Sequence, residues 1–343
     1  MSLIREAKVA VITGTTSNLG LNVAYRLLED VPAEENLTIV VTSRTLPKVN
    51  DAIRLLKTYA EKKNLRKGVL EFDYLLLDFT NMVSVLSAYH ELSKRYTHID
   101  YFIANAAQGV YSGIHWPLVA YYLVTDFDIA VKAAPYRIQR TGVKSADGLG
   151  LVFQANVFGP YYLVSKLTKL LKGGKVIWVS SVLAEPKSLS FDDLQLVKSD
   201  IPYEGSKRLL DLMFMGSYKK FSKQGVYHNL VQPGIFTSFG FYEYLNFFTY
   251  FGMLMSFYLA RLIYSECHNV SGYNAANALV TSALNDEPQD KKIGLASSRF
   301  GREYIVRDEV DATGAEDVAA YLDKLVDEWD ENFKDQIVNS RQM

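Results

Sequence analysis

Short apolar runs alternate with longer amphipathic stretches along most of the chain. Runs of this length, rich in Val, Ile and Leu, predict strands that are buried on both faces. Six of them are visible, at 8–13, 37–42, 71–77, 99–104, 175–181 and 226–231. The stretches between them have a helical period, so helices are expected at 19–29, 45–64, 81–96, 147–171, 201–215 and 272–285. This alternation predicts an α/β fold with a doubly wound, mostly parallel sheet in a single domain over 1–343.

Three segments fall outside the alternation. Residues 110–146 have no clear period, so we expect an irregular insertion within the domain rather than a second domain. Residues 286–300 read as a polar linker, and a short last strand is expected at 304–306. Residues 316–338 have a charged face and an apolar face, which predicts an amphipathic C-terminal helix.

A fourth segment, residues 236–264, is unusually aromatic. It contains twelve aromatic residues, and its only charged residues are Glu243 and Arg261, so that 244–260 is an uncharged run of 17 residues. This length is at the lower limit for a helix that spans a bilayer. We interpret the segment as a helix pair that covers an apolar substrate and dips into one leaflet of a membrane. A buried lid, a dimer face and a true membrane span are the alternatives.

Composition narrows the classes of function. The net charge of −1 gives no general attraction to nucleic acid, and the single cysteine, Cys267, excludes an intrachain disulfide. The five histidines are scattered without cysteine partners, so no metal site is expected. We expect no signal peptide, since the first core strand begins at Lys8 with no apolar stretch before it.

The first strand leads directly into a turn of small residues. Its sequence is Thr13-Gly14-Thr15-Thr16-Ser17-Asn18-Leu19-Gly20, and the first helix follows. Small residues let a ligand approach the backbone, and the N-terminus of a helix offers unpaired N–H groups to a phosphate. The turn therefore predicts a pyrophosphate site made by Gly14, Thr16, Asn18, Leu19 and Gly20. The alternative is an ordinary strand–helix turn.

The residues after the second strand indicate which dinucleotide binds. An NAD site usually has a carboxylate here, whereas an NADP site has a basic residue for the 2′-phosphate. This chain has Thr42, Ser43 and Arg44, with Lys48 one helical turn later, so we predict NADPH. The alternative is that Arg44 is a solvated residue at a helix start.

Polar residues also stand at the ends of the third, fourth and sixth strands. Asp78 either caps the next helix or contacts an adenine amino group, and Asn105 lies among alanines that permit close approach of a cofactor. Four residues after the sixth strand, Pro233, Gly234, Ile235 and Thr237, are further candidates for cofactor contact. The carboxyl ends of parallel strands meet at one edge of the sheet, so all these residues are expected to gather there.

The candidate chemistry is centred on Tyr203 and Lys207, which share one face of the predicted helix at 201–215. A cation near a phenol lowers the pKa of that phenol, and the phenol can then protonate a developing alkoxide. Ser180 and Ser181 end the fifth strand and offer a second hydrogen bond to a carbonyl. Asn156 is a poor residue for a helix interior, so we expect it to bond a backbone carbonyl or to hold a water. The alternative is a tolerated polar residue.

Two other Tyr-x-x-x-Lys pairs, at Tyr59 and Tyr162, show that the spacing alone is not diagnostic. The complete set nevertheless resembles the short-chain dehydrogenase/reductase family, which has a Rossmann-type fold. The matching residues are the turn from Thr13 to Gly20, Asn105, Asn156, Ser181, Tyr203, Lys207 and Pro233-Gly234. The resemblance implies that Tyr203 donates the proton and that Lys207 lowers its pKa and binds the nicotinamide ribose. It also implies that Ser181 orients the carbonyl and that Asn156 holds a relay water.

Three features depart from that family. Asn18 replaces a glycine in the turn and is expected to tolerate left-handed geometry. The run Ala104-Asn105-Ala106-Ala107 differs from the usual Asn-Asn-Ala-Gly. The interval from Ser181 to Tyr203 is long, which leaves both Ser180 and Ser181 as candidates.

Longer motifs resemble the fungal 3-keto-steroid reductases of sterol synthesis. They are 153–162, 203–208, 231–238 and 243–253. The resemblance implies NADPH-dependent reduction of the C3 ketone of a 4-demethylated 3-ketosterol to a 3β-hydroxysterol. It also implies work at the endoplasmic reticulum. From the aromatic segment we expect a monotopic contact with the cytosolic face of that membrane or with lipid droplets, and an oligomer or a complex with other sterol enzymes as further associations. Reduction of another lipophilic ketone, and a scaffold role among membrane enzymes, are the alternatives.

Overall fold

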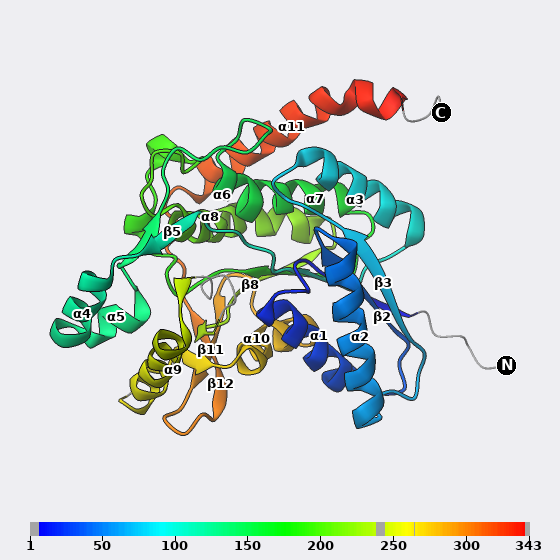
Figure 1. The fold of residues 1–343 in the computed structure, drawn as a ribbon. Coiled ribbons are helices and arrows are strands. Elements are labelled where there is room, and N and C mark those ends of the chain that lie inside the picture. The colour runs from blue at the N-terminus through cyan, green and yellow to red at the C-terminus, as the bar shows by residue number, and fades with distance from the viewer. Residues whose placement is uncertain (1–6, 238–243, 264, 340–343) are drawn as a thin grey trace.

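The computed structural model describes residues 7–237, 244–263 and 265–339. A sheet of eight strands forms the centre of the molecule (Figure 1). In spatial order the strands are β12 (Glu303–Asp308), β11 (Lys292–Ser297), β8 (Tyr227–Gln232), β7 (Lys175–Val179), β4 (Tyr101–Ala104), β1 (Lys8–Ile12), β2 (Leu37–Ser43) and β3 (Leu70–Leu76). Only β12 runs antiparallel to its neighbour in this sheet. The α/β doubly wound fold and all six predicted strands are confirmed.

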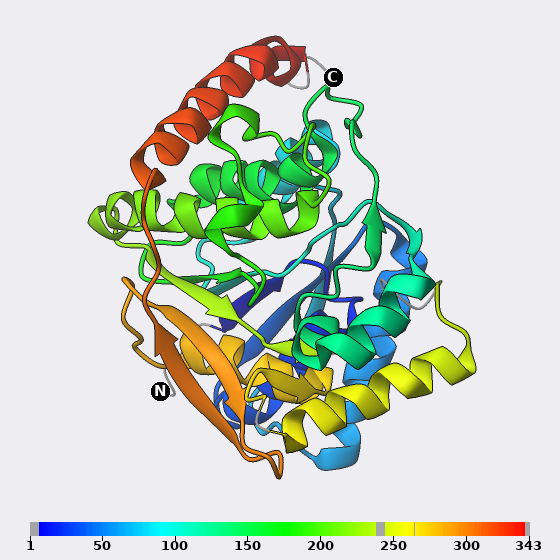
Figure 2. The ribbon, with the colours of Figure 1, turned by 90° about the vertical axis from the view of Figure 1, so that its left-hand side faces the viewer.

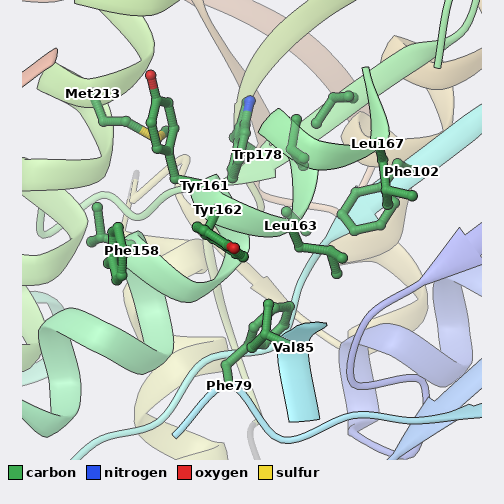
Figure 3. Close-up of a cluster of buried hydrophobic side chains, with 14 of the residues drawn as sticks. Phe79, Val85, Phe102, Phe158, Tyr161, Tyr162, Leu163, Leu167, Trp178 and Met213 are labelled. Carbon is green, nitrogen blue, oxygen red and sulfur yellow. The ribbon is translucent and has the colours of Figure 1, made fainter. Parts of the chain in front are cut away.

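Helices cover both faces of the sheet and create two cores. On one face lie α1 (Asn18–Asp30), α2 (Leu46–Lys63) and α10 (Gly272–Leu284). On the other face lie α3 (Met82–Arg95), α7 (Gly159–Leu167) and α8 (Pro202–Lys223), with α11 (Ala315–Asn339) packed outside them. Figure 3 shows the second core, where Trp178 of the sheet lies near Tyr161 of α7 and Phe102 of the sheet lies near Leu167.

The C-terminal helix is fastened by specific polar contacts as well as by its apolar face. The hydroxyls of Tyr161 and Tyr162 donate to Asp323 and Asp330 at 2.6 and 2.7 Å, respectively. Because both tyrosines are fully buried and their hydroxyls donate to carboxylates of α11, each side chain links the core to the outer helix. The predicted helix at 316–338 is thus confirmed.

The insertion at 110–146 is more regular than predicted. It forms a hairpin of β5 (Tyr111–Ile114) and β6 (Arg137–Gln139), with α4 (Trp116–Thr125) and α5 (Phe127–Lys132) between its strands. The prediction of an irregular segment was wrong because α4 lacks the polar face that marks most surface helices.

Two further predictions are corrected. Residues 286–300 are not only a linker, since β11 lies within them and is buried along most of its length. In the aromatic segment, the described residues form a short strand, β9 (Ile235–Phe236), and one helix, α9 (Phe247–Leu262), instead of a helix pair. The two helices of the insertion, α4 and α5, lie beside α9 (Figure 2). In the described chain, no helix has the length and apolar content required to cross a bilayer.

A short strand, β10 (His268–Val270), pairs with β9.

The long helix predicted at 147–171 is not continuous. That stretch divides into α6 (Leu151–Phe153), a π-helical turn (Gln154–Phe158) and α7. Pro186–Ser188 and Phe191–Asp193 form two 3₁₀ turns in the connection before α8.

Candidate active site

A cavity of about 1070 Å³ lies at the carboxyl edge of the sheet. Most of the predicted site residues line it: Gly14, Thr16, Asn18, Leu19, Thr42, Ser43, Arg44, Lys48, Asp78, Asn105, Ser180, Ser181, Tyr203, Lys207, Pro233, Gly234 and Ile235. Three predicted residues do not line the cavity, namely Gly20, Asn156 and Thr237. The structure therefore brings together groups that are spread along the chain from Gly14 to Ile235. They meet at the carboxyl edge of the parallel strands, where ligands bind in sheets of this kind.

The small-residue turn is held open by contacts that require glycine at two positions. Gly14 has φ of 65°, and its N–H donates to Thr42 Oγ1 at 2.8 Å. A Cβ at Gly20 would lie 2.3 Å from the Gly14 carbonyl oxygen, so only glycine permits this packing of α1 against the turn. Gly20 thus shapes the turn from beneath. Ser17 caps α1, because its Oγ accepts the Gly20 N–H at 3.1 Å.

Asn105 supports the same turn from the neighbouring strand. Its Nδ2 donates to the carbonyl oxygens of Thr13 and Gly14 at 2.8 and 3.2 Å. Its own N–H donates to Thr13 Oγ1 at 2.9 Å. These bonds fix the end of β4 against the turn after β1, so Asn105 shapes the phosphate cradle as well as lining it.

The expectation for Asn18 is corrected. Asn18 is the first residue of α1 and is not among the residues with positive φ. Its Nδ2 donates to the carbonyl of Thr237 at 2.5 Å, which ties the turn to the segment after β8. Thr237 is itself bonded through its N–H to Val270 O at 3.0 Å. Asn18 therefore connects two walls of the cavity, and left-handed geometry is not its role.

The far end of the cavity has the charge that the 2′-phosphate of NADP requires. Arg44 and Lys48 are exposed side chains that line it, directly after β2. The adjacent Asp78 does not cap α3, because Asn81 does so by accepting the Ser84 N–H at 3.1 Å. Asp78 instead accepts from the N–H and hydroxyl of Thr80 and faces the cavity, as the adenine interpretation requires. The glycine turn, the exposed helix terminus and this basic end together fit a dinucleotide phosphate.

The two serines after β7 have different partners. The Ser180 hydroxyl is buried and donates to Asp211. The Ser181 oxygen accepts the N–H of Leu183 at 3.1 Å, which leaves its hydroxyl proton for a group in the cavity. Of the two candidates, Ser181 therefore has the geometry of a hydrogen-bond donor to a substrate carbonyl.

Tyr203 and Lys207 lie one turn apart on α8, as their spacing predicts, and both line the cavity. The Lys207 ammonium is 5.7 Å from the centre of the Tyr203 ring and donates to the Val179 carbonyl at 2.7 Å. Burial raises the pKa of the Tyr203 phenol to about 12, against the opposing effect of Arg137. Burial also lowers the pKa of Lys207 to about 8, whereas Asp211 acts in the opposite direction.

The predicted lowering of the pKa of Tyr203 by Lys207 is therefore not found in this structure. The physical reason is that desolvation disfavours the phenolate more than the charge of Arg137 favours it. A phenol that keeps its proton over the physiological range is still a competent proton donor. Proton transfer then depends on the charge that develops on the substrate oxygen.

Asn156 is a connector between three segments. It lies in the π-helical turn, where its Oδ1 accepts the Gln108 N–H at 2.7 Å and its Nδ2 donates to the Gln108 carbonyl at 3.0 Å. The same Nδ2 donates to Ser206 Oγ at 2.9 Å, and that hydroxyl donates to the Tyr203 carbonyl at 2.6 Å. The alternative of a merely tolerated polar residue is excluded, and Asn156 bonds a backbone carbonyl as predicted, although in another segment. π-Helical turns are frequent at functional sites.

Sequence reasoning missed a support for Tyr203 that comes from the insertion hairpin. The N-terminus of α8 has no side-chain cap of its own, and Gln139 of β6 accepts the Tyr203 N–H at 3.1 Å. Gln139 Nε2 and Arg137 donate to the two oxygens of Glu204 at 2.6 and 2.7 Å. The Tyr111 ring also packs against Tyr203, with centroids 6.1 Å apart. The only sequence signal was an acidic residue in the first turn of a helix, and that pattern is common.

A second missed feature is a buried ion pair under the serines. Asp211, on α8, accepts from Ser180 and from Lys292 of β11, the latter at 2.5 Å. Lys292 also donates to the Ser181 carbonyl at 3.2 Å. The pair thus fixes the end of β7 relative to α8. It was not predictable because Lys292 stood in a segment that was interpreted as a linker.

The other end of the cavity is apolar. It is lined by Ile114, Trp116, Val119 and Leu123 of the insertion and by Leu245, Met253 and Phe257 of the aromatic segment. Such a wall suits a rigid hydrocarbon, since each Å² of apolar surface removed from water contributes about 25 cal/mol.

No family model matches the chain. Among the described residues, no cluster of three or more metal-binding side chains occurs.

Comparison with known proteins gives full-length relatives. The chain is 58% identical to the 3-keto-steroid reductase of Debaryomyces hansenii over 98% of both chains. It is 56% identical to the 3-keto-steroid reductase ERG27 of Candida albicans over 100% of both, and 52% identical to that of Saccharomyces cerevisiae over 97% of this chain and 98% of the relative.

Solved structures show the same fold at low identity. The L-sorbose reductase of Gluconobacter frateurii, solved with NADPH and L-sorbose, is 18% identical, with a TM-score of 0.55 over 82% of this chain and 92% of that one. A 7α-hydroxysteroid dehydrogenase solved with NADH is 14% identical, with a TM-score of 0.53 over 81% and 88%. The chain therefore belongs to the 3-keto-steroid reductase family and has the short-chain dehydrogenase/reductase fold.

Proposed function

We propose that this protein is an NADPH-dependent reductase that converts the C3 ketone of a 4-demethylated 3-ketosterol to a 3β-hydroxyl group in sterol synthesis. The observation that carries the proposal is one cavity that joins three parts: a phosphate-binding turn, a Tyr203–Ser181 pair and an apolar wall. The full-length relatives named 3-keto-steroid reductase support the sterol as substrate. Arg44 and Lys48 favour NADPH over NADH, because they offer positive charge to a 2′-phosphate.

The chain's own residues would act as follows. Bound NADPH supplies the hydride that C3 of the ketone accepts. The Ser181 hydroxyl donates a hydrogen bond to the carbonyl oxygen and keeps it beside Tyr203. The Tyr203 phenol donates its proton as the oxygen becomes an alkoxide, which yields the alcohol and NADP⁺. Lys207, anchored on Val179 O, would hold the nicotinamide ribose and balance the phenolate until a solvent proton returns.

The test is NADPH oxidation by the purified protein with a 3-ketosterol, and with retinal as a competing lipophilic ketone. We expect the sterol to be reduced and retinal to be reduced poorly. Replacement Tyr203→Phe should lower turnover by about 10²-fold to 10⁴-fold, while NADPH still binds. Preferential reduction of retinal would favour the rival substrate class, and near-normal turnover of Tyr203→Phe would refute the mechanism.

We further propose that the protein works on the cytosolic face of the endoplasmic reticulum membrane or on lipid droplets, through the exposed faces of α4 and α9. Phe247, Phe248 and Val124 are 76, 82 and 87% exposed. Apolar side chains this exposed support a partly apolar surrounding such as one leaflet. The same surface would serve a neighbouring sterol enzyme in a complex or a second copy in an oligomer. A variant without turnover that still sustains a partner enzyme's activity would reveal a scaffold role.

A further inference from the structure

Helix α9 has two uncharged faces with different surroundings. One face lines the cavity, with Thr249, Gly252, Met253, Ser256 and Phe257, which follow the i, i+3, i+4, i+7, i+8 spacing of a single helix face. The other face points outward, with Phe247, Phe248, Phe251, Met255, Tyr258, Leu259 and Leu262, each at least 46% exposed. Only Ala260 of this helix is buried. The helix is therefore a single layer that separates the cavity from the surroundings of the protein.

Helix α4 has the same character on the other side of the cavity. Trp116, Val119 and Leu123 line the cavity, yet Trp116 and Leu123 are also 45 and 44% exposed. Tyr121 and Val124 point outward, and none of its residues is buried. Figure 2 shows the α4–α5 pair beside α9, and residues of both α4 and α9 line the cavity. The exposed lining residues on α4 and α9 border an opening of the cavity at its apolar end, which we call the mouth.

Gly252 lies at this mouth and has no packing role. It is exposed and lines the cavity, and a Cβ at this position would meet nothing within 4 Å. Glycine in the middle of a helix is unfavourable compared with alanine, and neither a tight turn nor a close contact requires it here. The missing side chain leaves open space between α9 and the cavity, which is the property that a passage for a bulky ligand needs.

We propose that the sterol enters and leaves the cavity across Gly252, through an opening between α4 and α9 that faces the lipid bilayer. This inference rests on the proposed sterol reduction and assigns its access route. A sterol ketone has very low solubility in water, so a mouth with an apolar rim on both sides would accept it directly from the acyl chains. The route avoids transfer through water, and it gives a reason for helices that are apolar on both faces.

The first experiment adds bulk at the mouth. Gly252→Ala, Gly252→Leu and Gly252→Trp should lower kcat/KM for the sterol progressively, by about 10-fold to 200-fold for the larger side chains, which is the range of size discrimination in apolar pockets. The affinity for NADPH should stay unchanged. The midpoint of thermal unfolding should stay unchanged or rise, because glycine is an unfavourable residue in a helix interior. The control is Met255→Trp, which adds bulk to the outward face of the same helix and should leave detergent-solubilised sterol turnover unaltered. Equal sterol turnover across the series, or a parallel loss of NADPH affinity, would overturn the proposal.

The second experiment tests the source of the sterol. With ketosterol in phosphatidylcholine vesicles at constant total concentration, we expect the rate to fall as extra lipid dilutes the sterol in the bilayer, provided the enzyme is already vesicle-bound. Phe248→Asp, on the outward face, should reduce vesicle binding and the rate on vesicle-borne sterol but not the rate on detergent-solubilised sterol. If the wild type fails with detergent-solubilised sterol, the proposed function fails. If that reaction proceeds but the vesicle rate does not depend on surface dilution, only the access route is wrong.

Discussion

The insertion hairpin should control turnover through the start of α8, and Arg137→Met tests this. Arg137 donates to Glu204 at 2.7 Å, and the two side chains are 15 and 11% exposed. At this distance and an effective dielectric constant of about 20, their gross attraction is about 6 kcal/mol. Desolvation cancels much of that energy, so the pair itself is worth far less. Removal of one partner leaves a poorly solvated carboxylate next to Tyr203.

Breaking a buried pair typically costs about 3–5 kcal/mol. The hydrogen bond from Gln139 remains in Arg137→Met and the site borders solvent, so we expect a loss of about 2–3 kcal/mol in the free energy of unfolding. Glu204→Gln in the same background should recover part of this loss, since no charge is then left unpaired. The double-mutant cycle should give a coupling of about 1–3 kcal/mol by denaturant titration.

The same variant separates a positioning role from a structural one. If the hairpin positions Tyr203, kcat at a temperature where all variants are folded should fall about tenfold, the equivalent of 1.4 kcal/mol, while NADPH affinity is retained. Arg137→Lys should restore part of kcat, because an ammonium supplies charge without the planar fork. A loss of stability with full kcat per folded molecule would refute the positioning argument.

Three further outcomes are expected. Ser181→Ala should lower kcat by about 10²-fold, whereas Ser180→Ala should mainly lower stability, because the Ser180 hydroxyl already donates its proton to Asp211. Equal kinetic effects would contradict this division. Arg44→Ala should weaken NADPH binding, by fluorescence titration, far more than NADH binding, and an equal loss would refute the NADPH assignment. For pH, Lys207 loses its charge as pH rises through about 8, so kcat/KM for reduction should decrease above pH 8, and a flat profile to pH 10 would show that this charge is not needed.

The sequence predicted the strands and the residues at their ends for one physical reason. Parallel strands are apolar on both faces, and their carboxyl ends share one edge, so a local reading of each strand also locates Gly14, Arg44, Asn105 and Ser181. What it could not predict were partners fixed only by tertiary contact. Lys292 and Asp211 are 81 residues apart and meet because β11 joins the sheet beside β8.

The missed strand and the missed cap have a similar origin. β11 follows a polar stretch and contains a glycine, so its few apolar residues were too short a run to indicate a strand within the predicted linker. Gln139 and Arg137 belong to a three-residue strand, and nothing in such a short run indicates that it borders a helix 65 residues further on. The choice between Ser180 and Ser181 also needed coordinates, since neighbouring residues differ only in the direction of their hydroxyls.

The failure to recognise α4 is informative about function. Helices on a soluble protein are detected by the contrast between an apolar face and a polar face, and α4 and the middle of α9 have little such contrast. Full burial in the core would explain an apolar helix, but α4 has no buried residue and α9 has only Ala260. An apolar ligand on the inner side and lipid on the outer side would account for both observations. The pattern that concealed α4 from a periodicity analysis is therefore the pattern expected of a helix between a sterol site and a membrane.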